Sequence, residues 1–132
     1  MRDNLDLARG WMRKAESDLA TCRLDLDSNG PYDTACFHAQ QVVEKYLKGF
    51  LASAGQPAPR SHNLEELQRL CIVIALELLI PEIDLTELTS YAVQLRYDFD
   101  FWPDRDTAEQ ALKVAERVRS AVLALVPERA RP

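Results

Sequence analysis

The stretch from Phe37 to Leu51, FHAQQVVEKYLKGFL, places several hydrogen-bonding side chains inside a pattern that otherwise predicts a buried helix. His38, Gln41, Lys45 and Lys48 follow one another at steps of three, four and three residues, so on a helix they form one stripe. Imidazole, amide and ammonium groups on one face can donate hydrogen bonds to an anionic ligand such as a phosphate. The alternative is a solvated helix face, with the His38 ring bonded to neighbouring helices.

A second group of candidates stands at the end of the fourth predicted helix. Arg96 and Tyr97 lie there, next to the aromatic stretch YDFDFWPD. A guanidinium binds phosphate bidentately, and Tyr97 or Tyr91 offers a ring for stacking, so these residues indicate a nucleotide site. The alternative is that Arg96 pairs with an acid such as Asp98 or Asp100 while Tyr97 packs. The aromatic stretch is interpreted as a lid on the core or as a dimer contact.

His62 is a secondary candidate, either as a ligand contact or as an anchor for the loop before the third helix. Other chemistries lack their residues: there is no Gly-rich phosphate loop, no His/Cys ligand cluster and no HExxH sequence. Cys36 and His38 are two residues apart and face different sides of a helix, which excludes a nucleophile pair. We expect no metal and no cofactor, and we expect Cys22, Cys36 and Cys71 to be small buried hydrophobic residues.

Five helices must position these side chains, and the helical spacing of apolar residues predicts each of them. The first helix carries apolar residues from Leu5 to Leu26 at alternating steps of three and four. Asn63 with Glu66, and Asp84 with Glu87, resemble capping boxes at two later starts. The expected bounds are about 3–26, 31–54, 63–79, 84–97 and 104–127.

Within the second predicted helix, a rotation of about 100° per residue separates a core face from the polar stripe. Gln40 and Glu44 are assigned to the far flank beside Phe37, and Glu44 is expected to pair with Lys48 at i,i+4. The core face holds Cys36, Ala39, Val43, Tyr46, Leu47 and Phe50.

No alternating strand pattern competes with the helical one. The 132 residues therefore predict a single all-α domain over 1–132, an up-and-down antiparallel bundle of four main helices plus a shorter one. A net charge of −5 disfavours a protein that grips duplex DNA by neutralising phosphates. The longest apolar run, LCIVIALELLIP, is too short to cross a bilayer, and the first residues lack the apolar segment of a signal peptide. We therefore expect no membrane association and a cytoplasmic location.

Three pieces of the sequence, taken together, resemble the HEPN domain family of small prokaryotic helical proteins. They are FHAQQVVEKYLKGFLASAG, then RSHNLEEL, then YAVQLRYD. The likeness extends from WMRKAESDL in the first helix to PDRDTAEQALKVAERV in the last. The resemblance implies a five-helix bundle, nucleotide binding and a homodimer. It also implies a partner, a minimal nucleotidyltransferase, as in toxin–antitoxin pairs.

Other members of this family are metal-independent ribonucleases whose site is an arginine followed four to six residues later by a histidine. Here Arg60 is two residues before His62, Arg23 is far from His38, and no histidine follows Arg96. The ribonuclease residues therefore cannot be transferred to this chain. The sequence also has Asp98 where many relatives have proline after Arg-Tyr, which alters the turn.

The leading hypothesis is a non-enzymatic protein that binds a nucleotide or RNA, a partner protein, or both. Its ligand site would combine the stripe of the second helix with Arg96 and Tyr97. One alternative is a ribonuclease with an atypical site, using His38 or His62 with Arg96. Another is a structural module that binds only protein.

Overall fold

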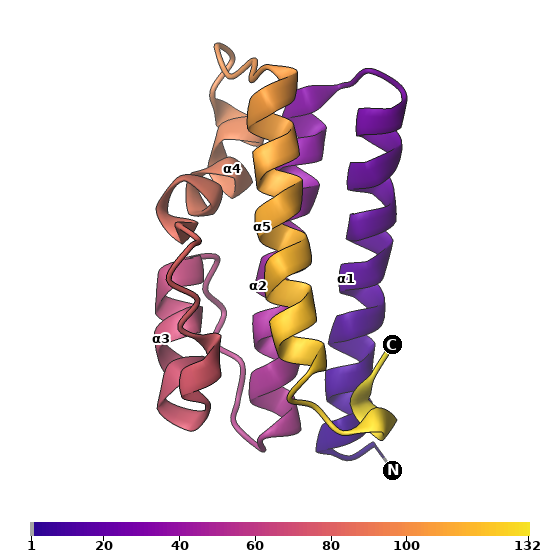
Figure 1. The fold of residues 1–132 in the computed structure, drawn as a ribbon, viewed down its shortest axis with the longest axis vertical. Helices are drawn as coiled ribbons and strands as arrows, with labels where there is room; N and C mark the ends of the chain where they lie inside the picture. The colour runs from indigo at the N-terminus through magenta and orange to yellow at the C-terminus, as the bar shows by residue number, and fades with distance from the viewer. Residues whose placement is uncertain (1) are drawn as a thin grey trace.

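The computed structural model describes residues 2–132, and its regular elements there are helices, which confirms the all-α prediction. Three long helices, α1 (Asn4–Asp27), α2 (Tyr32–Ser53) and α5 (Arg105–Leu123), run side by side (Figure 1). Two shorter helices, α3 (Leu64–Ile74) and α4 (Leu85–Tyr97), lie one beyond the other along the same side of this group (Figure 1). Single 3₁₀ turns, η1 (Leu76–Leu78) and η2 (Glu128–Ala130), complete the structure.

Side-chain caps start four of the helices. Asp3 and Asp6 form a reciprocal capping box at α1. Asp84 accepts from the Thr86 amide at α4, and Asp104 accepts from the Thr107 amide at α5. Asn63 accepts from the Glu66 amide at α3, but the Glu66 carboxylate binds the Ser61 hydroxyl, so the predicted box is only half formed.

Helix α2 is the central element because α1, α3, α4 and α5 all pack against it. A helix surrounded in this way is buried on most of its circumference. The predicted core face is confirmed, since all of its residues are buried. The closest approach is to α1: a Cβ added to Gly49 would lie 3.3 Å from the Ala8 carbonyl oxygen. The predicted stripe of α1 is buried from Ala8 onward, at Ala8, Met12, Ala15, Leu19, Cys22 and Leu26, and Asp18 is buried beside it.

The third helix is shorter than the limit at about Leu79 that the sequence allowed, and the segment after Ile74 takes the irregular alternative. Helix α3 ends at Ile74, because Ala75 adopts extended backbone with φ −140° and ψ 104°. The β-branched run from Ile72 to Ile74 has weak helix propensity, and the turn that follows buries Leu78 and Ile80. The Gln68 side chain holds this turn by donating to the Leu78 carbonyl at 2.8 Å.

A band of exposed aliphatic side chains follows α3 and η1. We call it the α3–η1 patch, and it consists of Leu70, Val73, Ile74, Leu76 and Leu79. Exposed aliphatic groups this close together are typical of an interaction surface. No helix within residues 2–132 is both long and apolar enough to cross a membrane.

Candidate functional site

The polar stripe of α2 lies between α1 on one side and the α3–α4 side of the bundle on the other. His38, Gln41 and Lys45 are partly exposed, so these three reach the surface. Lys48 is different: its side chain is buried and its ammonium group lies 3.2 Å from Glu44 Oε2. The stripe is therefore not one solvated face, because its fourth residue belongs to an internal cluster.

Two residues of the stripe, His38 and Lys45, are bound to a carboxylate from α1. Asp18 Oδ1 lies 2.8 Å from His38 Nδ1, and Asp18 Oδ2 lies 2.6 Å from Lys45 Nζ. Burial alone would raise the pKa of Asp18, but the hydrogen bonds from His38 and Lys45 outweigh it and lower the pKa below its ordinary value. Asp18 therefore stays ionised and offsets positive charge on the stripe.

Sequence reasoning missed Asp18. The available signal was its place on α1: Asp18 directly precedes Leu19 of the buried stripe and lies one turn after Ala15. A carboxylate at the margin of a buried face is expected to find a cation on the helix packed against it.

The lower part of the stripe joins a buried cluster around Glu44. Besides Lys48, Glu44 Oε1 lies 2.8 Å from His62 Nδ1, and Gln40 Nε2 donates to the same oxygen at 3.2 Å. Gln40 also donates to the His62 carbonyl and accepts from Gln41. The assignment of Gln40 and Glu44 to an outer flank is wrong, because the loop that carries His62 returns over this side of α2 and buries both.

Arg96 reaches α2 through an aromatic ring. Its guanidinium carbon lies 5.5 Å from the centre of the Phe37 ring, a cation–π distance. The Phe37 ring in turn meets the His38 ring edge to face, with centroids 5.3 Å apart. The expected pairing of Arg96 with Asp98 or Asp100 is absent: within residues 2–132 Arg96 forms no ion pair.

The two tyrosines that were candidates for stacking have opposite environments. Tyr97 is 73% exposed, so its ring is open beside Arg96. Tyr91 is buried, stacks on Phe101 with centroids 5.4 Å apart, and donates its hydroxyl to Glu87 Oε1 at 2.9 Å. Burial and the neighbouring carboxylate raise the pKa of Tyr91. Arg96 and His38 therefore lie in one region, joined through Phe37, with Tyr97 next to Arg96 in sequence, and Tyr91 lies in another.

We call the first region the Arg96 site, made up of Arg96, Tyr97, Phe37, His38, Gln41 and Lys45. It offers one guanidinium free of any carboxylate, together with partly exposed donors. Such a set suits a phosphate group or a planar base. In the described part of the chain, no cluster of three His, Cys, Asp or Glu side chains has a geometry that holds a metal ion.

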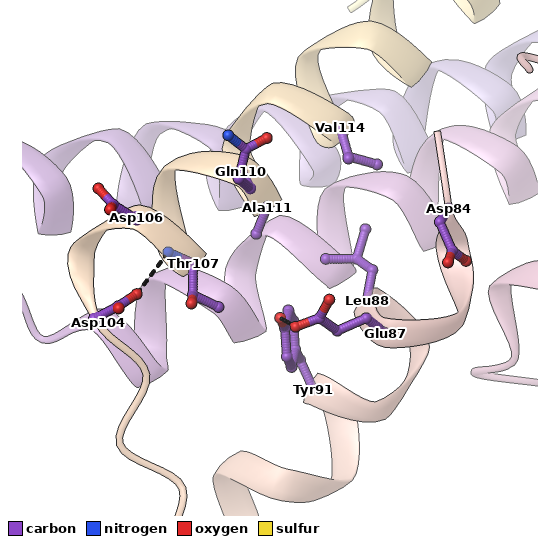
Figure 2. Close-up of a pocket in the computed structure, with 10 residues that line it drawn as sticks. All are labelled: Asp84, Glu87, Leu88, Tyr91, Asp104, Asp106, Thr107, Gln110, Ala111 and Val114. Carbon is purple, nitrogen blue, oxygen red and sulfur yellow. Dashed lines mark hydrogen bonds between the residues drawn. The ribbon is translucent and has the colours of Figure 1, made fainter. Parts of the chain in front are cut away.

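A second concave region, unforeseen in the sequence, lies between α4 and α5 (Figure 2). One pocket of about 270 Å³ has apolar side chains, such as Leu88 and Ala111, between several carboxylates. A neighbouring pocket of about 360 Å³ includes Phe101 and Trp102 of the loop that precedes α5. Tyr91 and Glu87 line both pockets, so we call the pair the α4–α5 groove.

A comparison with protein-family models gives one match, to the model described as HEPN domain, over residues 8–125. That span includes all five α-helices except the first turn of α1. No curated protein matches the chain, and no solved structure does.

Proposed function

The chain belongs to the HEPN domain family, and from this premise we propose that it binds the phosphate of a nucleotide or of an RNA end at the Arg96 site. The observation that carries the proposal is the position of the Arg96 guanidinium, 5.5 Å from the Phe37 ring centre and outside every ion pair of residues 2–132. An unpaired guanidinium held over an aromatic ring has its donors free for an anion.

The charge balance of the Arg96 site limits what it binds. Lys45 and His38 both contact Asp18, so that carboxylate already offsets the positive charge of Lys45. Arg96 therefore supplies the net positive charge of the site. The side chains of Gln41, His38 and Lys45 supply further polar groups. Such a site fits one phosphate with a base stacked on Tyr97, and it does not fit a long run of duplex phosphates.

Isothermal titration calorimetry with ATP, GTP and a short single-stranded RNA tests the proposal. We expect binding that Arg96→Ala weakens about tenfold or more, since a hydrogen bond to a charged group contributes roughly 1.5–3 kcal/mol. Arg69→Ala is the matched control, because Arg69 is exposed on α3 and belongs to no ion pair of the described residues. Absence of heat with all three ligands at millimolar concentration would contradict the proposal.

A variant of the Arg96 site distinguishes RNA binding from RNA cleavage. His38 binds Asp18 through Nδ1, which leaves Nε2 as the nitrogen for a proton-transfer role. Labelled RNA is incubated with the purified protein and with His38→Ala. Cleavage that disappears in the variant would favour the atypical ribonuclease, whereas equal residual cleavage in both samples would identify a contaminant.

A second candidate function is association with protein, and the α3–η1 patch favours it. Val73, the most exposed residue of that patch, is 84% exposed. Arg69 directly precedes the patch in sequence and Glu77 lies near its other end, so two copies packed face to face in opposite directions can bring unlike charges together. A homodimer through this patch fits the proposal of a toxin–antitoxin-like pair, in which the dimer accompanies a minimal nucleotidyltransferase.

Multi-angle light scattering of the wild type and of Val73→Glu tests the dimer. We expect a dimer mass for the wild type and a monomer for the variant, because the substitution puts a charge at the centre of an apolar contact. A monomer at high concentration in the wild type would remove the dimer. Co-purification with a nucleotidyltransferase encoded by a neighbouring gene tests the larger pair.

A further inference from the structure

We propose that the α4–α5 groove and the exposed aromatic loop at its end form a docking surface for a basic, arginine-containing segment of a partner protein. This surface is separate from the Arg96 site and from the α3–η1 patch, so its test is independent of theirs. The proposal stands on exposed rings, on the shape of the groove and on the sign of its charge.

The exposed rings come first. Phe99 is 87% exposed and Trp102 is 76% exposed, both in the loop between α4 and α5. Burying apolar side chains of this size is favourable, so two rings left in solvent on one short loop indicate a contact surface. Phe101 lies between them in sequence but turns inward onto Tyr91, which fixes the loop to α4 while its neighbours stay outside.

The groove consists of two neighbouring pockets, each of which could accept a side chain of a bound segment. Figure 2 shows Asp104 and Asp106 at one end of the first pocket, Asp84 at the other, and Glu87 with Tyr91 between them. The two pockets, of about 270 and 360 Å³, lie near the lower end of typical ligand cavities of roughly 300–1,000 Å³. Because they share a wall at Glu87 and Tyr91, they suit successive side chains of one extended segment.

The charge of the groove selects the occupant. Neither pocket is lined by a lysine or an arginine, and none of the lining carboxylates forms an ion pair within residues 2–132. The net charge of the whole chain is −5, so these carboxylates alone exceed its excess of negative charge. They are Asp84, Glu87, Asp98, Asp100, Asp104 and Asp106.

Local hydrogen bonds favour the ionised form of Asp84 and Asp104, two of these carboxylates. Asp84 and Asp104 each accept a backbone amide through one oxygen, Oδ1, at the start of a helix. These backbone bonds lower the pKa of both carboxyls, and a helix start also favours negative charge. Glu87 accepts the Tyr91 hydroxyl through Oε1. The second oxygen of Glu87 has no hydrogen-bond partner among the described residues and is available to a cation, whereas the Thr86 and Thr107 side chains also interact with Asp84 and Asp104.

Other occupants fit the surface poorly. Nucleic acid and the anionic face of a membrane would meet the carboxylates with like charge. A second copy of this chain, packed through the same surface, would bring its own carboxylates against them. A basic segment meets both features at once, because guanidinium groups pair with carboxylates and stack on exposed rings.

The test uses the full chain and a fluorescein-labelled peptide of alternating arginine and serine, with a peptide of alternating glutamate and serine as the control ligand. Anisotropy gives the Kd, and amide chemical shifts locate the peptide. We expect binding of the arginine peptide only, weakening as salt rises, with shifts confined to 84–114. Trp102→Ala should weaken binding about threefold to tenfold, since a partly solvated cation–π contact has this size.

Charge variants separate a docking surface from general attraction. Glu87→Gln combined with Asp106→Asn removes two groove charges and keeps the acceptor for the Tyr91 hydroxyl. Glu66→Gln combined with Glu128→Gln removes two exposed charges outside the groove and outside the α3–η1 patch. We expect a loss of about tenfold for the first pair and less than about twofold for the second.

Three results would overturn the proposal. Equal losses of affinity in the two double charge variants would show that the peptide is attracted only by the net charge of the protein. Full affinity in Trp102→Ala would leave the rings without a role. Spermine binding as tightly as the peptide, with no effect of Trp102→Ala, would make the groove a polyamine site.

Discussion

Lys45 Nζ lies 2.6 Å from Asp18 Oδ2, and this contact joins the most polar part of α2 to α1. The same carboxylate holds His38 through its other oxygen at 2.8 Å. Asp18 therefore binds the side chains of His38 and Lys45, which could otherwise bind an anionic ligand, and ties them to α1. The contact explains why Arg96, and not Lys45, is the main cation of the candidate site.

Replacing Asp18 by Asn should destabilise the protein by about 1–3 kcal/mol, because two charge-assisted contacts to a largely buried group are lost. Urea denaturation at about pH 7 measures the loss. The variant should also strengthen nucleotide binding at the Arg96 site, since Lys45 and His38 no longer face a carboxylate. Unchanged stability would mean that solvent replaces these contacts at no cost.

The contribution of Asp18 should depend on pH in one direction. Its pKa is lowered in the folded protein, so its stabilising effect is complete above the unfolded value, near 3.8. The effect disappears as the pH falls through the lower folded value. We therefore expect the difference in unfolding free energy between wild type and Asp18→Asn to be constant from about pH 7 to pH 5 and to shrink below about pH 4. A difference that grows on acidification would contradict this sign.

The pair of Glu44 and Lys48 should behave as a buried unit. Glu44→Gln leaves a buried ammonium without its carboxylate and should cost about 3–5 kcal/mol. The double variant Glu44→Gln with Lys48→Met removes both charges and should recover much of that loss. A double-mutant cycle from urea denaturation gives the coupling, and additive single effects would show that the two charges act independently.

Two glycines offer a matched pair of substitutions. A Cβ on Gly49 would lie 3.2 Å from Trp11 Cβ and 3.3 Å from the Ala8 carbonyl oxygen, whereas a Cβ on Gly10 would meet nothing within 4 Å. Gly49→Ala should destabilise by about 1 kcal/mol, because crowding of roughly 1–3 kcal/mol exceeds the gain in helix propensity. Gly10→Ala should stabilise by about 0.5–1 kcal/mol. Stabilisation by both changes would show that α1 and α2 separate easily.

The sequence predicted best what depends on neighbouring residues. The Asp84 cap, the start of the last helix at Asp104 and the apolar stripe of α1 are local patterns, and each lies where it was expected. The end of α3 was not predicted. Helical spacing continues into Leu76 and Leu79, but the β-branched run before them and the burial of Leu78 and Ile80 end the helix at Ile74.

The candidate site was predictable only in part, because its contacts join distant segments. The helical spacing of α2 grouped His38 with Lys45, but their shared partner Asp18 is on another helix. Gln40 and Glu44 are buried by the return of the His62 loop, which no pattern within α2 encodes. The α4–α5 groove forms where two successive helices and the loop between them pack together, and in the sequence its carboxylates were interpreted separately, as cap residues at Asp84 and Glu87 and as partners of Arg96 at Asp98 or Asp100.

The thiols give a last prediction, on the relative stability of the helices. Burial raises the pKa of Cys22, Cys36 and Cys71 to about 12, so all three stay protonated and unreactive near neutral pH. The native protein should resist a maleimide, while the unfolded protein should react at all three positions. Slow native labelling then reports local opening.

Cys71 should react first, because α3 has 11 residues and exposes Leu70, Val73 and Ile74 around it. Cys22 and Cys36 lie in helices of 24 and 22 residues that pack on each other. Mass spectrometry of proteolytic peptides resolves the labelling rates of the three cysteines. Val73→Glu should leave the order of these rates unchanged if the α3–η1 patch does not stabilise the monomer. A rate at Cys22 equal to that at Cys71 would mean that α3 opens only when the whole bundle unfolds.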